Sequence, residues 1–273
     1  MQRRHALSSR RLAARAWRAC APAALALGNV APVLAADAPT KPPTANAYVR
    51  YEQVARTKDG EGHAWRNFML LYRQCVGVRE LVYKLPPDGQ PDLNRIQREL
   101  DTATVEVFYT PQRAARYETR VLYTITGSRR KPPACSEIER KEVRRAQIFR
   151  DGRRYAVDLN TGSVIVSDAA PAFTARPWLL ADKLTGAEQR LGVTCTPLQA
   201  TQAPLAMRLE EGCVWDAYGG VMYLDTLPLF LHRRTAQLDG QIFVTQTAVE
   251  VRADAVIDPA VFDVAGLSSS KAK

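Results

Sequence analysis

Four cysteines could act as metal ligands, as thiol nucleophiles or as disulfides: Cys75, Cys135, Cys195 and Cys213. None is spaced as Cys-x-x-Cys, the close pair that is typical of zinc sites. A thiol nucleophile needs a base beside it, and after residue 35 the chain has only two histidines. Neither His63, after a glycine turn, nor His232, in a predicted strand, lies in a nucleophile motif. The cellular compartment decides among the three roles.

The N-terminal segment predicts that compartment. Residues 1–18 hold six arginines and no acidic residue, and an Ala/Leu/Val-rich run follows over residues 19–34. A basic region, a short apolar region and small residues before a polar start are typical of a secretory signal peptide. Val33 and Ala35 suit the cleavage site, so residues 1–35 are predicted to be removed. The apolar run contains proline and glycine and is shorter than the ~20 residues of a spanning helix.

Export changes the charge of the protein. The chain has 38 basic and 28 acidic residues. Without the six arginines of the signal segment the count is 32 against 28, a net charge of +4 instead of +10. The high isoelectric point therefore comes mostly from that segment, and nucleic-acid binding loses its main support. We expect a periplasmic protein that does not span the membrane.

In an oxidising compartment an even number of cysteines predicts disulfides. Four cysteines allow three pairings. We favour Cys75 with Cys135 and Cys195 with Cys213, because each pair would join stretches that are predicted to be neighbouring strands.

Other chemistry has weaker signals. No Walker A, G-x-G-x-x-G, H-E-x-x-H or G-x-S-x-G motif occurs, so we predict no catalytic residue, no metal site and no cofactor. A hydrolase would need two carboxyls roughly 5–10 Å apart. The candidate carboxyls lie near predicted strand ends and turns, where acidic residues are common without any catalytic role. The candidates are Glu137, Glu139, Asp158 and Asp168.

Two further groups could bind a ligand. Basic clusters are candidate anion contacts, although such runs are more often a solvated face; they comprise Arg129, Arg130, Arg144 and Arg145. Aromatic side chains are candidates for lining an apolar groove, with a core role as the alternative. They are Trp65, Trp178, Trp215, Phe173 and Phe230.

The elements that must position these residues are mostly strands. Apolar and polar residues alternate in YETRVLYTI, TVEVFYT and MRLEEGCVW, which is the period of a half-buried strand. Residues 144–168 are predicted to form a three-stranded meander, because Asp151-Gly152 and Asn160-Thr161-Gly162 are typical of tight hairpin turns. Short helices are predicted over residues 92–100 and 177–185, and a final turn over 258–264.

These elements predict a mainly β fold: one curved antiparallel sheet, a half-barrel, of about 10–11 strands with a few short helices on its concave side. The predicted organisation is a flexible leader over residues 36–46, one domain over residues 47–265 and a disordered tail over residues 266–273.

The meander and the closing segment, from GCVWDAYGGVMYL to DPAVFDV, resemble the LolA/LolB-like superfamily of periplasmic lipoprotein carriers over residues 138–264. That resemblance implies a half-barrel that holds an acyl chain, a lipid or a lipoprotein segment in an apolar groove, without catalysis. The two predicted helices would then act as a lid. The alternatives are a periplasmic hydrolase that uses carboxylates in the groove, and a scaffold protein whose sheet edge pairs with an envelope partner.

Overall fold

The computed structural model describes residues 45–168, 181–183, 186–200, 207–215, 229–237 and 240–269. The predicted signal segment, nearly all of the leader and the last four residues of the tail therefore lie outside the described residues. Phe173 and Trp178 lie outside them too.

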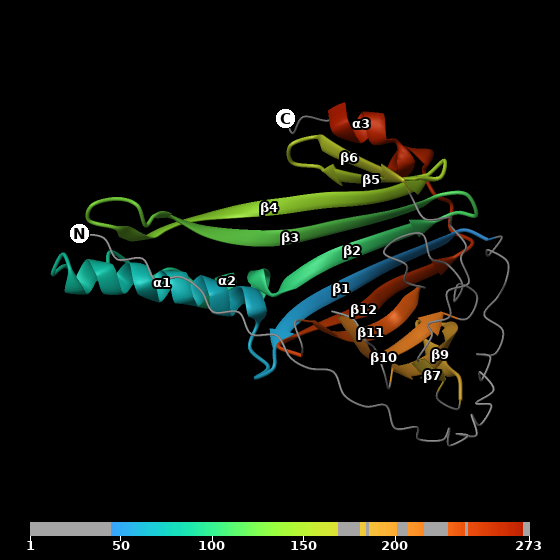
Figure 1. Ribbon diagram of the computed structural model, residues 1–273, viewed down its shortest axis with the longest axis horizontal. Coiled ribbons are helices and arrows are strands. Elements are labelled where there is room, and N and C mark those ends of the chain that lie inside the picture. Colours follow the sequence, from blue (N-terminus) through green and yellow to red (C-terminus); the bar gives the residue numbers. More distant parts are fainter. Residues whose placement is uncertain are drawn as a thin grey trace, which may run out of the picture. The chain divides into compact units, whose positions relative to one another are not determined.

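One antiparallel sheet dominates the described part of the chain (Figure 1). Its strands are β1 (Ala47–Thr57), β2 (Thr102–Tyr109), β3 (Ala114–Gly127), β4 (Ala134–Arg150), β5 (Arg153–Asp158), β6 (Ser163–Asp168), β7 (Ala181–Lys183), β8 (Glu188–Arg190), β9 (Val193–Ala200), β10 (Met207–Trp215), β11 (Phe230–Gln237) and β12 (Ile242–Ala253). The order is β6-β5-β4-β3-β2-β1-β12-β11-β10-β9-β7, and β8 also pairs with β9. Within the described ranges the sheet does not close, because β6 and β7 do not pair. The predicted fold class is confirmed.

The meander forms where the turn residues predicted it. Asp151 and Gly152 both have positive φ, of 53° and 72°, as the tight turn between β4 and β5 requires. Gly162 has a φ of 74° in the turn that leads into β6. Hairpin connections place β3, β4, β5 and β6 side by side, so residues from four strands meet on one patch of sheet.

Four helical segments accompany the sheet in the described residues: α1 (His63–Leu81), α2 (Leu93–Leu100), η2 (Pro259–Phe262) and α3 (Val264–Ser269). The prediction of α2 is confirmed. Its N-cap is Asp92, whose Oδ1 accepts the Arg95 N–H at 3.0 Å. Residues 258–264 contain the predicted turn as η2. Helix α1 was not predicted, and Cys75, which we expected in a strand, lies within it.

The helix predicted over residues 177–185 is wrong where it is described. Residues 181–183 form β7, in which Ala181 pairs with Ala200 of β9. A short apolar run fits a strand or a helix equally well, and the neighbouring strand supplies backbone partners here.

The long strands bury both faces. On the helix face, α1 and α2 pack on β3 and β4 through a cluster that includes Phe68, Ile96, Leu100 and Ile125. Further along the same face, η2 covers β3, β4 and β5 through the ring of Phe262, which is 3% exposed. The opposite face, called here the pocket face, carries the main apolar cluster of β1 and β2, which includes residues 49 and 105, both valines.

Candidate functional site

A pocket of about 420 Å³ lies on the pocket face, over β3, β4, β5 and β6. Its polar lining comes from five charged residues together with glutamine and serine: Arg116, Glu118, Arg120, Arg145, Asp158, Gln147 and Ser163. The register of the strands creates this grouping. Glu118 pairs with Arg145, Arg145 pairs with Asp158, and Asp158 pairs with Ser163, so these four form one row across the sheet.

Glu118 is held by arginines on its own strand. Arg116 Nη2 lies 3.0 Å from Glu118 Oε2, and Arg120 Nε lies 3.7 Å from Glu118 Oε1. The side chains of Arg116 and Glu118 are each only 16% exposed. Each carboxylate oxygen of Glu118 therefore has a guanidinium beside it.

Asp158 is held by the turn that follows β5. Its Oδ1 accepts the Thr161 N–H at 3.0 Å and the Asn160 N–H at 2.9 Å. These backbone donors, led by Thr161, lower the pKa of the Asp158 carboxyl, and the nearby positive charge of Arg145 acts in the same direction. The carboxyl is therefore ionised at neutral pH, and an ionised carboxylate has no proton to donate as a general acid.

The pocket keeps a net positive charge and one unused acceptor. Three arginines against two carboxylates leave +1. The carboxamide Oε1 of Gln147 is buried and accepts no hydrogen bond from the described residues. A buried acceptor without a partner costs about 1–3 kcal/mol. A ligand that carries both a donor and an anionic group would satisfy both features.

Apolar residues border the charged ones directly. Glu118 pairs with Val105 of β2 and Arg116 pairs with Val107, and both valines belong to the buried cluster. Tyr51, next in the row after Val105, is 3% exposed. Burial raises the pKa of the Tyr51 phenol, and the nearby guanidiniums of Arg233 and Arg116 only partly oppose this. The pocket face is thus apolar over β1 and β2 and charged over β3 to β5.

The predicted arginines do not form one anion site. Arg144 and Arg145 are neighbours in β4 and point to opposite faces, so only Arg145 lines the pocket. Arg129 and Arg130 lie in the turn between β3 and β4, where Arg130 Nη1 is 2.5 Å from Glu137 Oε1. Eight residues of strand, about 26 Å, separate Glu137 from Arg145.

The predicted groove aromatics are also dispersed. Trp65 lies with α1 on the helix face, Trp215 in the main cluster, and Phe230 in a small cluster with Leu209 and Val214. Phe173 and Trp178 lie outside the described residues.

The carboxylates of the hydrolase alternative do not gather in the pocket: Glu137 and Glu139 share one face of β4 outside it, and Glu137 is paired with Arg130. Glu137 lies at the far end of β4 from the pocket, and Glu139 lies six residues, about 20 Å, from Arg145. Both are therefore too far from Asp158, which pairs with Arg145, to act with it across the pocket. Asp158 lines the pocket, while the side chain of Asp168 lies outside the described residues.

The two histidines lie elsewhere. His63 Nε2 is 3.3 Å from Asn67 Nδ2 on α1. His232 contacts Thr247 through Nδ1 and Glu211 through Nε2, at 3.1 and 3.3 Å. Neither histidine is part of the pocket lining.

Both predicted disulfides are present, Cys75–Cys135 and Cys195–Cys213. Glu188 lies beside the sulfurs of Cys195 and Cys213. Those sulfurs are oxidised and are not thiolates, so this group does not have the donors that zinc selects.

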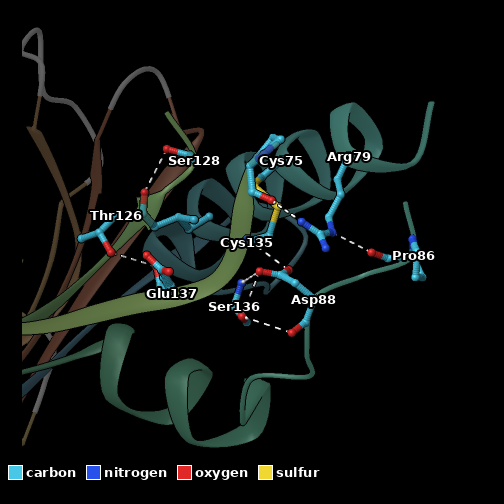
Figure 2. Close-up of a disulfide and its surroundings, with 11 residues drawn as sticks. Cys75, Arg79, Pro86, Asp88, Thr126, Ser128, Cys135, Ser136 and Glu137 are labelled. Atoms are coloured by element: carbon cyan, nitrogen blue, oxygen red, sulfur yellow. Dashed lines mark hydrogen bonds between the residues drawn. A yellow bond between two sulfur atoms is a disulfide. The ribbon is translucent and has the colours of Figure 1, made fainter. Parts of the chain in front are cut away.

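Figure 2 shows how the Cys75–Cys135 disulfide ties α1 to the start of β4. The Asp88 carboxylate accepts the N–H groups of Cys135 and Ser136, at 3.1 and 3.3 Å. Arg79 donates to the carbonyl oxygens of the two prolines at positions 86 and 133. The helix, the loop after it and the hairpin therefore form one fixed unit.

Sequence reasoning missed the pocket itself. The even positions of YETRVLYTI, Glu118 and Arg120 among them, are largely polar, and that alternation indicated a solvent-facing side. Gln147 and Arg145 alternate in the same way on β4. Only the register of β3, β4 and β5 shows that these polar sides share one patch beside the apolar cluster.

Helix α2 does not cover this pocket. Glu99 of α2 accepts hydrogen bonds from Tyr123 and Arg140 on the helix face. The lid role expected of residues 92–100 is therefore not available over the pocket. Among the described helices, none is both long and apolar enough to cross a membrane.

No protein-family model matches the chain, and no curated protein matches it in sequence. Among solved structures, PNGF-II aligns with 81% of the chain at 8% identity and a TM-score of 0.37, and the chain spans only 30% of it. An uncharacterized conserved protein from Thermus thermophilus aligns with 80% of the chain and 84% of its own length, at 10% identity and a TM-score of 0.34. A domain described as a putative outer membrane lipoprotein-sorting protein, from Vibrio parahaemolyticus, aligns with 84% of the chain and 94% of its own length, at 7% identity and a TM-score of 0.29. At TM-scores below 0.5 we draw no inference from these likenesses.

Proposed function

We propose that the protein is a non-enzymatic periplasmic binding or carrier protein whose ligand is a lipid, or a lipid-bearing segment of a partner. The anionic head of the ligand occupies the pocket over β3 to β6. Its acyl part leaves the pocket beside Ile165, an apolar lining residue that is 72% exposed. The supporting observation is the lining of the pocket, where the guanidinium groups lie together with the exposed apolar side chain of Ile165.

The head group is recognised by charge. A phosphate or carboxylate accepts charge-assisted hydrogen bonds from Arg145 and Arg120, and a hydroxyl or amine of the head donates to Gln147 Oε1. A volume of about 420 Å³ suits a head group and leaves the acyl chain outside the pocket. Each chain carbon that is buried against apolar side chains contributes about 0.8 kcal/mol.

The compartment is part of the proposal. Two disulfides suit an oxidising space such as the periplasm. Carriage also fits the state of the carboxylates, because Glu118 is held by two arginines and Asp158 by two backbone donors.

The chain offers a matched pair of variants to test this. Arg145→Gln removes a pocket cation, while Arg144→Gln removes its neighbour in β4 on the other face. We expect Arg145→Gln to weaken binding of lysophosphatidylglycerol, measured by titration calorimetry, by at least tenfold, because a hydrogen bond to a charged group contributes about 1.5–3 kcal/mol. Arg144→Gln should leave the affinity within twofold.

The choice of head group separates the anionic site from nonspecific apolar binding. Lysophosphatidylcholine should bind more weakly than lysophosphatidylglycerol to the unaltered protein. Equal affinity of both arginine variants for lysophosphatidylglycerol would overturn the assignment of the pocket. Native mass spectrometry of the protein from a periplasmic extract should show a bound lipid.

One observation favours a scaffold role as a second candidate. Strand β6 is an edge of the sheet among the described strands, and it exposes Ile165 by 72% and Val166 by 52%. An exposed apolar edge can pair with a strand of a partner. Crosslinking in cells, followed by identification of peptides joined to residues 163–168, tests this role.

A further inference from the structure

Helix α1 exposes an apolar face that the fold does not use. Six of the twelve exposed large apolar side chains among the described residues lie within residues 70–85. They are Leu70, Leu71, Val78, Leu81, Val82 and Leu85. Leu81 is 73% exposed, and Leu70 and Val82 are each 67% exposed. Such a concentration marks an interaction surface, whereas single exposed apolar residues are ordinary.

Helical geometry gathers these side chains into one stripe. At 3.6 residues per turn, the five that belong to α1 or cap it lie within an arc of about 120°. Leu70 and Val82 mark the two edges of this stripe on the helix surface. No acidic residue, lysine or arginine falls within the arc between those edges. The adjoining arc holds Phe68 and Cys75, which are 4% and 6% exposed and pack on the sheet. Helix α1 is therefore apolar on two sides and buries only one.

The helix is docked firmly, so the exposure does not come from a loose element. Cys75 is bonded to Cys135, and Arg79 Nη1 donates to Pro133 O at 2.7 Å (Figure 2). Aromatic stacking adds to this, because the ring centroids of Phe68 and Tyr72 lie 6.1 Å apart. The stripe is held outward on a rigid support.

Basic residues border the stripe on both edges. Arg66 and Arg73, both exposed, follow the Leu70 edge of the arc, and Arg66 Nη1 lies 4.0 Å from Asp59 Oδ2. At the other edge, the Cys75–Cys135 bond brings in the β3–β4 turn, which carries Arg129 and Lys131 as well as Arg130, the last paired with Glu137. Residues 63–85 hold four basic residues and one acidic, so their net charge is +3.

We propose that the α1 stripe docks on the surface of an anionic phospholipid bilayer. An apolar helix face flanked by arginine and lysine is the pattern that lies flat in the interface, with the apolar side chains below the head groups. Each nearby cation adds attraction to anionic lipid. The 19 residues of α1 span about 28 Å, and the helix lies along the surface. This inference stands apart from the pocket, which is on the other face of the sheet.

Vesicle co-sedimentation of the full-length protein tests the proposal. The test compares vesicles of pure phosphatidylcholine with vesicles that also contain about 30 mol% phosphatidylglycerol, roughly one anionic lipid in three. The double variant Leu71→Ser/Leu81→Ser removes two side chains of the stripe. The control, Val166→Ser/Val256→Ser, removes two exposed apolar side chains elsewhere. Every variant shares the same N-terminal arginines, so differences between variants report on α1.

We expect the unaltered protein to prefer anionic vesicles and to lose binding as salt rises. The Leu71/Leu81 variant should bind about a hundredfold more weakly, roughly tenfold for each leucine no longer buried. The control and Arg145→Gln should bind as the unaltered protein does. Because Leu71 and Leu81 are both exposed, the variant should fold as the unaltered protein does, which circular dichroism checks.

Three results would overturn the proposal. The first is no binding of the unaltered protein to either vesicle. The second is equal binding by the Leu71/Leu81 variant. The third is a dimer in light scattering that this variant converts to a monomer, since a second copy of the chain would then cover the stripe.

Discussion

Loss of the Cys75–Cys135 disulfide should destabilise the protein more than loss of Cys195–Cys213. The first closes a loop with a sequence separation of 60 residues and the second a loop with a separation of 18. The chain-entropy relation gives about 4 kcal/mol for the longer loop and about 3 kcal/mol for the shorter one. Because the constant in that relation cancels, the difference of about 1 kcal/mol is the sharper expectation.

The structure adds a local reason for the same order. Cys75 joins α1 to the hairpin, and Phe68, Ile96 and Ile125 are buried between them. In Cys75→Ala/Cys135→Ala the helix keeps those apolar contacts but loses its covalent link. Cys195 and Cys213 join β9 and β10, which the sheet already pairs at Trp215 with Cys195.

Urea unfolding, followed by far-ultraviolet circular dichroism at neutral pH, measures both double alanine variants against the unaltered protein. The free energy of unfolding should fall in the order unaltered protein, Cys195/Cys213 variant, Cys75/Cys135 variant. A Cys75/Cys135 variant that is as stable as the other one, or more stable, would refute the reasoning.

Three further changes test individual contacts. The hydrogen bonds from Arg140, Arg95 and Tyr123 lower the pKa of Glu99 to about 2. This carboxylate therefore stabilises the fold above pH 4.5, and the stabilisation is lost as the pH falls towards 2. Glu99→Gln should flatten that part of the pH profile in thermal melts, and an unchanged profile would contradict the assignment. Gln147→Leu should stabilise the unliganded protein by about 1 kcal/mol, because it removes an unpaired buried acceptor, while calorimetry shows weaker lysophosphatidylglycerol binding; a loss of stability would count against the role given to this side chain. The Tyr117 hydroxyl donates to Val261 O at 2.6 Å, so Tyr117→Phe should cost about 1 kcal/mol in urea unfolding, and hydrogen exchange should rise in residues 259–269.

Strands, turns and helix ends were predictable from the sequence where neighbouring residues determine them. Asp151-Gly152 supplies the positive φ that the β4–β5 turn needs, and Asp92 supplies the cap of α2. The pairing of Cys75 with Cys135 was also predicted, but the expectation that both lie in strands was wrong. Apolar residues cover two sides of α1, so its polar residues, Arg66, Arg73 and Glu80 among them, are confined to a narrow arc and the helical periodicity is weak.

The pocket required long-range information. Glu118, Arg145 and Asp158 lie up to 40 residues apart, and they form one row only because of strand register. A shift of one residue would send each side chain to the other face. Alternation along one strand cannot supply that register. For the same reason, Arg144 and Arg145 were grouped as one site although they point apart.

An amide chemical-shift titration with lysophosphatidylglycerol tests the central claim, that the charged pocket over β3 to β6 holds the head of an anionic lipid. The largest changes should fall at the pocket residues of β3 and β4, such as Arg116, Arg145 and Gln147, and their saturation should weaken in Arg145→Gln. Changes confined to residues 70–85, or no saturable change at all, would contradict the claim.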